Sequence, residues 1–327
     1  MKDYKAERAR RFYKGKLKLM KRIVITGATG FIGQYMTQKL IENNWEVFVV
    51  VRPDSNHKEK ILHHPNIQVI NLDISIIENV VRLIGHADVF CHLAWSGVNR
   101  GEIDSDTIHS ENVKNSLKCA GTALKLGCKV FLDAGSRAEY GIVEGVMRED
   151  IDCNPITAYG KAKLEFYRAT EKMMKENMAT YYHLRIFSVY GDGDHPWSLI
   201  SMLTRDLSRG KKVSLSPCLH KWNYMYITDL VNAIYGLIER GMYRDESEQI
   251  VVNICGNDTR PLYEFVHEIH RLTNGKSILE FGSYIQGKEG AVSIIPDNSR
   301  LLNLLGEYKE EYSFVEGIRC IINNLKD

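Results

Sequence analysis

The sequence predicts an α/β protein with a doubly wound parallel sheet and a smaller, mainly helical C-terminal lobe. Over the first two-thirds of the 327 residues, short runs rich in Val, Ile and Phe alternate with longer helical patterns. Such alternation is typical of a parallel sheet covered by helices. The apolar runs lack a strict apolar–polar alternation, which indicates strands buried on both faces. Beyond about residue 190, turn-rich and then helical segments replace this pattern.

The expected elements follow one another in a regular order. The apolar run 23–25 leads at once into a glycine-rich turn and a helical pattern over 32–43. Right-handed crossovers between parallel strands then fix much of the topology. The remaining expected strands are 47–51, 67–72, 88–93, 130–132, 181–186 and 250–254.

Two changes in composition divide the chain. Residues 191–196 are rich in turn formers, and residues 217–226 are aromatic and irregular. From Gly256 onward helical patterns dominate. We therefore expect a larger domain of residues 21–190 and 220–256, and a smaller lobe of residues 191–219 and 257–327 that closes over the carboxyl edge of the sheet.

The net charge is only +2, but basic residues concentrate at the N-terminus. Residues 1–22 hold ten Lys and Arg against Asp3 and Glu7, a local charge of +8 that leaves −6 for the remainder. The mildly acidic body predicts no nucleic-acid partner. The leader lacks the apolar segment and cleavage site of a secretory signal. We expect residues 1–20 to be a basic extension, with Met20 as an alternative start and a membrane- or RNA-binding arm as an alternative role.

Cysteine usage and hydropathy exclude several classes of protein. The seven cysteines are scattered and form no Cys-x-x-Cys pair, so neither a disulfide framework nor a zinc site is predicted, and we expect no metal. No apolar run approaches the roughly 18 residues that a membrane-spanning helix needs. These observations predict a cytoplasmic protein with no membrane partner.

A glycine pattern directly follows the first expected strand and opens the first expected helix. In Gly27-x-x-Gly30-x-x-Gly33, the first glycine permits a tight turn, the second lets the backbone approach a pyrophosphate, and the third allows close helix–strand packing. The helix N-terminus adds unpaired N–H groups. The pattern predicts a dinucleotide site, so the larger domain is expected to be dinucleotide-binding. The expected contacts are Gly27, Thr29, Gly30, Phe31, Ile32 and Gly33.

The residues after the second and third strands bear on the kind of dinucleotide. An acidic side chain after the second strand would accept from a ribose 2′-hydroxyl, but this sequence has Arg52, whose guanidinium suits a 2′-phosphate. We therefore predict NADP, with NAD as the alternative because Asp54 can still reach a ribose hydroxyl. Asp73 and Ile74 are also assigned to the cofactor. Asp73 either accepts from the adenine amino group or caps a helix.

Three residue types typical of hydride chemistry follow. Tyr159 and Lys163 are four residues apart and lie on one face of an expected helix. Ser136 comes just after the strand 130–132, at the edge where parallel sheets bind ligands. Placed after a dinucleotide loop, this combination predicts an oxidoreductase that uses a nicotinamide dinucleotide.

These motifs occur together with several others, in one order, from Lys21 to near the C-terminus. The segments are 27–33, 73–74, 92–94, 112–113, 136–141, 159–163, 184–191 and, less specifically, 281–282 with 296–297. In this combination the chain resembles the extended short-chain dehydrogenases/reductases, the NAD-dependent epimerase/dehydratase family. Within that family it is most similar to nucleotide-sugar 4-ketoreductases of the CDP-abequose synthase type. The resemblance implies a Rossmann-type sheet and a nucleotide-diphosphate sugar as substrate.

The resemblance also implies roles for individual residues. Tyr159 is the acid/base, and Ser136 hydrogen-bonds the reacting oxygen. Lys163 holds the nicotinamide ribose and, with the cationic nicotinamide, moves the tyrosine pKa down from about 10 toward a useful range. Leu93 and Ala94 line the cofactor, and Asn112 steadies the site.

The reaction is narrowed by the residues after Ser136. Dehydratases of this group have Asp-Glu where this chain has Arg137 and Ala138, so dehydration is not expected unless Glu139 takes that role. We predict NADPH-dependent reduction of a 4-keto group, because Arg52 favours NADPH. A 4-epimerase that retains NAD is the alternative. A dinucleotide-binding regulator without turnover is the alternative from another class.

Substrate binding is where the sequence departs from the family pattern. Relatives usually have a diphosphate-binding Arg in place of Trp222, another near Gly287, and Asn in place of Ser188. Lys221 and Lys288 are the neighbouring cations. Trp222 either stacks on a base or packs the lobe interface. The residues assigned to the substrate are Arg137, Ser188, His195, Lys221, Trp222 and Lys288.

The helical segments 112–126 and 159–174 would, by the same resemblance, form a four-helix bundle across a homodimer. The apolar stripe of Leu117, Ala120, Ala123 and Leu124 is compatible with that bundle. The same stripe is equally compatible with packing inside one chain.

Overall fold

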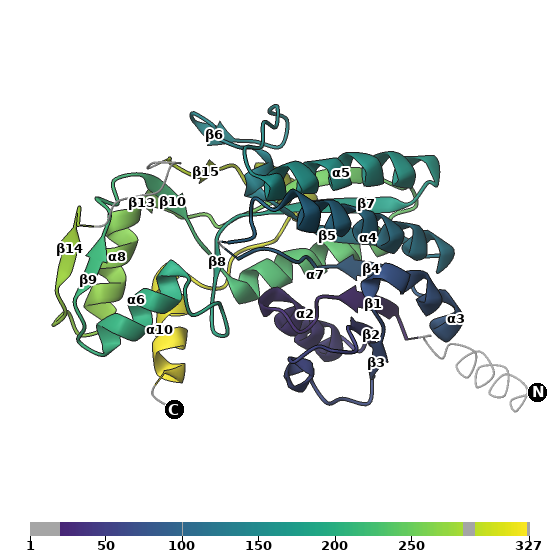
Figure 1. The fold of residues 1–327 in the computed structure, drawn as a ribbon, viewed down its shortest axis with the longest axis horizontal. Coiled ribbons are helices and arrows are strands. Elements are labelled where there is room, and N and C mark those ends of the chain that lie inside the picture. The colour runs from purple at the N-terminus through teal and green to yellow at the C-terminus, as the bar shows by residue number, and fades with distance from the viewer. Residues whose placement is uncertain (1–19, 100, 284–291, 326–327) are drawn as a thin grey trace, which may run out of the picture.

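A computed structural model of the chain describes residues 20–99, 101–283 and 292–325. The chain folds around one long sheet with helices on both faces, and a group of smaller elements lies beyond one end of that sheet (Figure 1). The predicted basic extension, except Met20, and the predicted substrate residue Lys288 lie outside the described residues.

Seven strands form the main sheet, and every neighbouring pair is parallel. Their order across the sheet is β12-β7-β5-β4-β1-β2-β3. The chain thus moves outward from β1 in one direction and then from β4 in the other, which is the doubly wound, Rossmann-type order. The predicted fold class is therefore confirmed. The strands are β1 (Arg22–Thr26), β2 (Glu46–Val51), β3 (Ile67–Asn71), β4 (Val89–His92), β5 (Val130–Ser136), β7 (Thr180–Ile186) and β12 (Gln249–Ile254).

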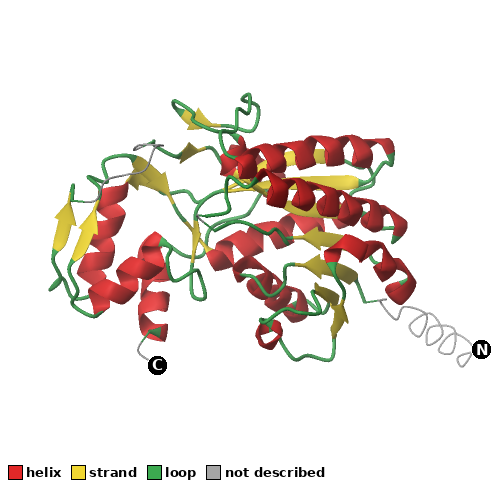
Figure 2. Cartoon of the chain, in the orientation of Figure 1, coloured by secondary structure: helices red, strands yellow, loops and turns green. Residues whose placement is uncertain are grey.

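Helices cover both faces of this sheet (Figure 2). Alternate residues of one strand point into different cores: Ile23 and Ile25 of β1 belong to one buried cluster and Val24 to another. The first cluster lies under α2 and α7, and the second under α3, α4 and α5. Burial on both faces explains why the strands read as unbroken apolar runs. The helices are α2 (Phe31–Glu42), α7 (Ile227–Tyr243), α3 (Val80–Ile84), α4 (Asp106–Lys125) and α5 (Ala158–Glu176).

The smaller elements gather beyond the carboxyl edge of the sheet (Figure 1). Segments far apart in sequence meet there: β9 pairs with β14, and β10 pairs with β13. The predicted division into a sheet domain and a lobe of residues 191–219 and 257–327 stays a prediction, and α9 (Ser299–Leu305) within the second segment packs on α7 and β12. The smaller elements are α6 (Leu199–Ser208), β9 (Val213–Leu215), β10 (Lys221–Asn223), β13 (Thr259–Pro261), α8 (Leu262–Leu272), β14 (Leu279–Phe281) and α10 (Phe314–Asn324).

The short pairs β8 with β11 and β6 with β15 join the sheet to these smaller elements. Their bounds, with those of the 3-10 turns, are β8 (Val189–Tyr190), β11 (Met225–Tyr226), β6 (Val146–Met147), β15 (Ile295–Pro296), η1 (Lys58–Lys60), η2 (Ile74–Asn79) and η3 (Arg137–Glu139).

The apolar stripe of α4 packs within the chain. Ala120 and Ala123 are buried in the cluster under α3, α4 and α5, and Leu117 and Leu124 pack against it. The stripe therefore gives no support to a dimer, which stays a prediction. Within the described ranges, no helix has the length and apolar character needed to cross a bilayer, and no group of His, Cys, Asp and Glu has a metal-binding arrangement.

Candidate active site

The glycine loop lies between β1 and α2, as the sequence predicts. Gly30 is the N-cap of α2, and no side chain of the protein caps the first turn. The first N–H groups of the helix are therefore not satisfied by a capping side chain and can serve an anion. Gly33 is needed for packing, because a Cβ there would stand 2.1 Å from the carbonyl oxygen of Gly27.

The loop adjoins the residues that follow β4. Gly27 has φ +79°, and a Cβ on it would stand 2.7 Å from the backbone nitrogen of Ala94. β1 and β4 are neighbours at the point where the strand order reverses, which is where such sheets bind ligands. The predicted contacts in the loop thus lie beside the predicted contacts Leu93 and Ala94. A free helix N-terminus beside this crevice fits a dinucleotide pyrophosphate.

Arg52 and Asp73 are brought together at the far side of the same edge. Arg52 follows β2 and is exposed, and Asp73 follows β3. Asp73 caps η2, because its Oδ1 accepts the backbone N–H of Ser75 at 2.9 Å. This hydrogen bond and, more weakly, the charge of Arg52 lower the Asp73 pKa. The predicted helix cap is therefore present, next to Ile74, and the contact with adenine stays a prediction.

Ser136 is the last residue of β5 and the N-cap of η3. Its Oγ accepts the N–H of Ala138 at 3.1 Å, and its own N–H donates to Glu139 Oε1 at 2.7 Å. This reciprocal capping box fixes the backbone at the strand end. The sequence Ser-x-x-Glu carries the capping-box signature, but we did not predict a turn here.

Tyr159 is placed by the start of α5. Thr157 caps this helix by accepting the N–H of Gly160, and the N–H of Tyr159 donates to the carbonyl of Ile103 at 3.1 Å. Burial raises the Tyr159 pKa to about 12, while a hydrogen bond with Ser136 and the charge of Arg137 act in the opposite direction. The tyrosine is therefore protonated at neutral pH, which suits a proton donor.

Lys163 lies one turn further along α5, with only 3% of its surface exposed. Its Nζ donates to the carbonyl oxygen of Ala134 at 2.6 Å and lies 3.6 Å from the centroid of the Trp95 ring. Burial lowers the Lys163 pKa to about 8, against the charges of Asp133 and Glu139. In this geometry Nζ is engaged with Ala134 and Trp95. The lowering of the tyrosine pKa by Lys163 together with the cationic nicotinamide stays a prediction.

Trp95 and His109, which the sequence did not single out, lie beside Tyr159 and Lys163. The Trp95 ring stacks on His109 at 6.4 Å, and His109 packs on Tyr159 at 5.6 Å. The predicted residue Asn112 holds the loop that carries Trp95: its Nδ2 donates to the carbonyl of Ser96 at 2.8 Å, and its Oδ1 accepts the Ser96 N–H. No spacing signal links Trp95 to His109, because the contact forms only when β4 and α4 meet.

A cavity of about 1210 Å³ lies between the carboxyl edge of the sheet and the smaller elements. Both Ser136 and Tyr159 line it, together with Arg137. Among its described lining residues the charged ones are Arg137 and Arg205, and none is acidic. The opposite wall includes Trp197, Met202, Leu215, His220, Trp222 and Leu262.

The predicted substrate residues are only partly brought together. Trp222 lines the cavity, donates its indole N–H to Ser188 Oγ at 2.9 Å, and faces the Arg137 guanidinium at 5.4 Å. Trp222 thus packs against neighbouring residues and also borders the cavity, while its stacking on a base stays a prediction. His195 and Lys221 are exposed and are absent from the described lining residues. Instead, His195 stacks on Trp197 at 4.7 Å.

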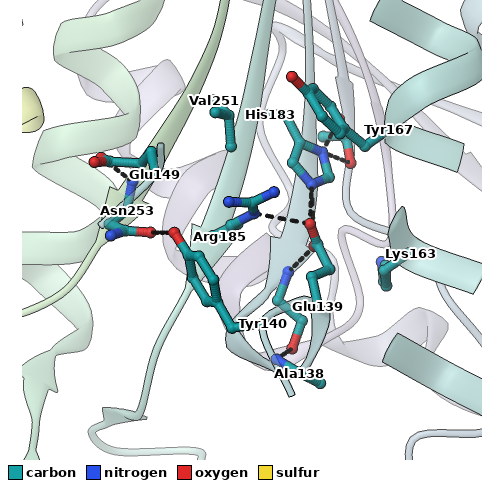
Figure 3. Close-up of polar contacts among 12 residues, drawn as sticks. Ala138, Glu139, Tyr140, Glu149, Lys163, Tyr167, His183, Arg185, Val251 and Asn253 are labelled. Carbon is teal, nitrogen blue, oxygen red and sulfur yellow. Dashed lines mark hydrogen bonds and ion pairs between the residues drawn. The ribbon is translucent and has the colours of Figure 1, made fainter. Parts of the chain in front are cut away.

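Glu139 is not available as the acid/base of a dehydratase. It is fully buried, and its carboxylate is bound by His183 Nε2 and Arg185 Nε, each at 2.9 Å, as drawn in Figure 3. Swinging it into the cavity would leave these buried cations unpaired. Glu139 is therefore paired inside the protein and is absent from the described residues that line the cavity.

Comparison of the sequence with family models identifies the family of this chain. The sequence model of the NAD dependent epimerase/dehydratase family matches residues 23–255. The chain belongs to this family. The match runs from the second residue of β1 to just beyond β12 and so covers the main sheet except Arg22.

Individual relatives are distant. The chain is 22% identical to a CDP-abequose synthase of Salmonella muenchen over 310 residues, 94% of this chain and 99% of the relative. It is 25% identical to a UDP-N-acetyl-alpha-D-glucosaminuronate decarboxylase of Bacillus cytotoxicus, covering 79% and 82% of the two chains. Among solved structures, a UDP-glucose 4-epimerase from Thermotoga maritima superposes with a TM-score of 0.80 at 23% identity, covering 93% and 98%.

Proposed function

We propose that this chain reduces the 4-keto group of a nucleotide-activated deoxysugar, with NADPH as hydride donor and Tyr159 as proton donor. The observation that carries the proposal is that Ser136 and Tyr159 line one cavity, whereas the Glu139 carboxylate is buried and bound by His183 and Arg185. The cavity therefore offers a proton donor from α5 and a hydrogen-bonding hydroxyl from the end of β5, without the additional carboxylate that water loss requires.

The chain's own residues perform the acid/base part of the reaction. When bound, NADPH supplies a hydride to the carbonyl carbon. Ser136 hydrogen-bonds the carbonyl oxygen, and Tyr159 donates its hydroxyl proton to that oxygen as negative charge develops there. Lys163 and Arg137 stabilise the phenolate that remains, until it regains a proton from solvent.

The cavity suits an anionic substrate. Arg137 stands beside Ser136 and lines the cavity, whose described lining residues include no acidic side chain. Arg205, the other cation there, binds Asp206 and the carbonyl of Pro196. A nucleoside diphosphate is an anion of matching chemistry, and the apolar wall with Trp222 fits a base or a deoxysugar ring. CDP-abequose synthase, a relative over nearly the full chain, is named for a nucleotide-linked sugar.

NADP is the proposed cofactor, because Arg52 occupies the edge of β2 where a 2′-phosphate would lie. NAD is the alternative, and a 4-epimerase that retains it is the second candidate function. That candidate is favoured by neighbours such as the UDP-glucuronic acid 4-epimerase of Bacillus cereus, solved in complex with NAD at a TM-score of 0.79.

The test offers the purified chain CDP-, dTDP- and UDP-4-keto-6-deoxyhexoses with NADPH or NADH. The expected result is oxidation of NADPH matched by an alcohol at C4, and transfer of deuterium to C4 from NADPH deuterated at its reactive position. Tightly retained NAD with interconversion of UDP-hexoses and no net oxidation of cofactor would instead establish the epimerase. Binding of NADPH with no turnover of these sugars would count against the reductase and favour the regulator.

A further inference from the structure

Four ionisable side chains are buried together directly behind Ser136. Asp133 on β5, Glu139 on η3, and His183 and Arg185 on β7 each expose 2% of their surface or less. Removing four charges from water is expensive, and well-packed apolar residues would stabilise a fold at least as well. We name this group the buried charge cluster, and Figure 3 shows part of it.

His183 is the centre of the cluster. Its Nδ1 lies 3.1 Å from Asp133 and its Nε2 2.9 Å from Glu139. A neutral imidazole can donate through one nitrogen only, so two carboxylate partners require the imidazolium. These two carboxylates raise the His183 pKa to about 9 against the effect of burial. With Arg185 on Glu139, two positive and two negative charges cancel.

The cluster touches the catalytic residues at two points. Glu139 Oε1, which also contacts His183, accepts the N–H of Ser136 at 2.7 Å. Gly135 makes room for this arrangement, because a Cβ there would stand 2.5 Å from His183 Nε2 and 2.8 Å from Glu139 Oε1. The second contact is indirect: Lys163 donates to the carbonyl of Ala134, the residue that follows the cluster member Asp133 on β5.

The charges that face Lys163 and His183 come from every element packed around them. Asp133 from β5 and Glu139 from η3 act on the charge of Lys163. Tyr159 lies on the same helix as Lys163, α5. His92 from β4 is neutral, because burial lowers its pKa to about 4. The remaining groups around His183 are Tyr181 and Arg185 from β7 and Tyr167 from α5.

We propose that Glu139, clamped by His183 and Arg185, is a positioning residue that holds the Ser136 backbone and, together with Asp133, keeps the buried Lys163 ammonium charged. The inference rests on the proposed function only in giving Ser136 and Lys163 a catalytic purpose. The electrostatic part follows from the cluster itself and can be tested without a sugar substrate.

The test uses Trp95 as a local reporter, because its ring lies 3.6 Å from Lys163 Nζ. Loss of the ammonium charge changes the field on the indole, so emission is titrated from about pH 6 to about pH 11 around the ordinary Lys range. The transition assigned to Lys163 is the one absent from both Lys163→Met and Trp95→Phe.

Four proteins then form a charge series. His183→Gln leaves the cluster with one extra negative charge, and the wild type and the double variant have none. Glu139→Gln removes one of the two carboxylates that keep His183 protonated, so this variant has one extra positive charge only below the lowered His183 pKa. The Lys163 midpoint should therefore be highest in His183→Gln, by about one pH unit over the wild type and the double variant, and should not be higher in Glu139→Gln than in the wild type. Glu248→Gln is the matched control, because it removes a carboxylate that pairs with Arg240 and Arg244 at the opposite end of the sheet, and it should not move the midpoint.

Thermal melts identify the members of the series that fold, and any two folded members of different charge test the order. A midpoint in His183→Gln no higher than in the wild type, or a higher one in Glu139→Gln, would overturn the electrostatic role. With a sugar substrate found, Glu139→Gln should lower kcat by about a hundredfold through misplacement of Ser136, with a smaller change in KM. An unchanged kcat would overturn the positioning role. If no sugar is reduced, the proposed function fails while the charge series still decides this inference.

Discussion

The carboxyl edge of the sheet has two ligand-facing regions that use different chemical groups. At the ends of β1 and β4 the structure relies on backbone: Gly27 and Gly33 leave space, and an uncapped helix N-terminus points at the crevice. At the ends of β5 and β7 the structure relies on buried charge: Glu139 pairs with His183 and accepts the N–H of Ser136. The difference teaches that a cofactor pyrophosphate can be met by N–H groups alone, whereas a proton donor needs a controlled electrostatic environment.

The largest effect is expected from removing the proton donor on the charged side. Tyr159→Phe keeps the ring against His109 and loses the hydroxyl that lines the cavity. Turnover should fall by about a hundred- to ten-thousandfold, the usual contribution of acid/base catalysis, while NADPH titrated by its fluorescence binds as in the wild type. Turnover within tenfold of the wild type would remove Tyr159 from the mechanism.

The charged side should also make stability depend on pH. The His183 pKa is about 9 in the fold against an ordinary 6.5. A raised pKa contributes stability that is complete below pH 6.5 and is lost as pH rises through 9. Titration of His183 should therefore remove roughly 3 kcal/mol of stability in urea unfolding over that window. The Lys163 pKa of about 8, below the ordinary 10.5, offsets about 1 kcal/mol of this loss between pH 8 and pH 9.

His183→Gln is the control for this pH dependence, and its free energy of unfolding should stay nearly flat across the same window. Parallel curves for the wild type and the variant would show that the loss comes from other groups. The glycine loop offers no comparable titrating group.

One glycine on each side permits a direct comparison. Gly33→Ala brings a Cβ to 2.1 Å from the Gly27 carbonyl oxygen, and Gly135→Ala brings one to 2.5 Å from His183 Nε2. The first should weaken NADPH binding, and the second should lower kcat with binding nearly intact, each by about tenfold to a hundredfold for clashes of about 1–3 kcal/mol. Gly121→Ala, in open space on α4, is the neutral control. Loss of NADPH binding in both variants would show that the glycine-loop region and the region behind Ser136 do not have separate roles in binding and catalysis.

The glycine-loop region could be predicted from the sequence more completely than the buried charge cluster. The loop from Gly27 to Gly33 was predictable because strand, turn and helix are consecutive, and so was the i, i+4 pair on α5. The contact of Glu139 with His183 was not, because it joins residues 44 apart through the pairing of β5 with β7. The contacts of Lys163 with Ala134 and Trp95 likewise form only when α5, β5 and the loop after β4 come together.

The smallest effect is expected at an exposed side chain of the cofactor side. Arg52 stands after β2 and lowers the pKa of Asp73 through its charge. Arg52→Ala should weaken NADPH by about tenfold, the value of one charge-assisted hydrogen bond at a solvated site, and leave NADH nearly unchanged. Isothermal titration of both cofactors measures this ratio, with Lys58→Ala as the control, since Lys58 donates to the carbonyl of Pro53 nearby. Equal weakening of the two cofactors would mean that Arg52 shapes the loop and does not read the 2′-phosphate, and the backbone would then account for all dinucleotide recognition at this edge.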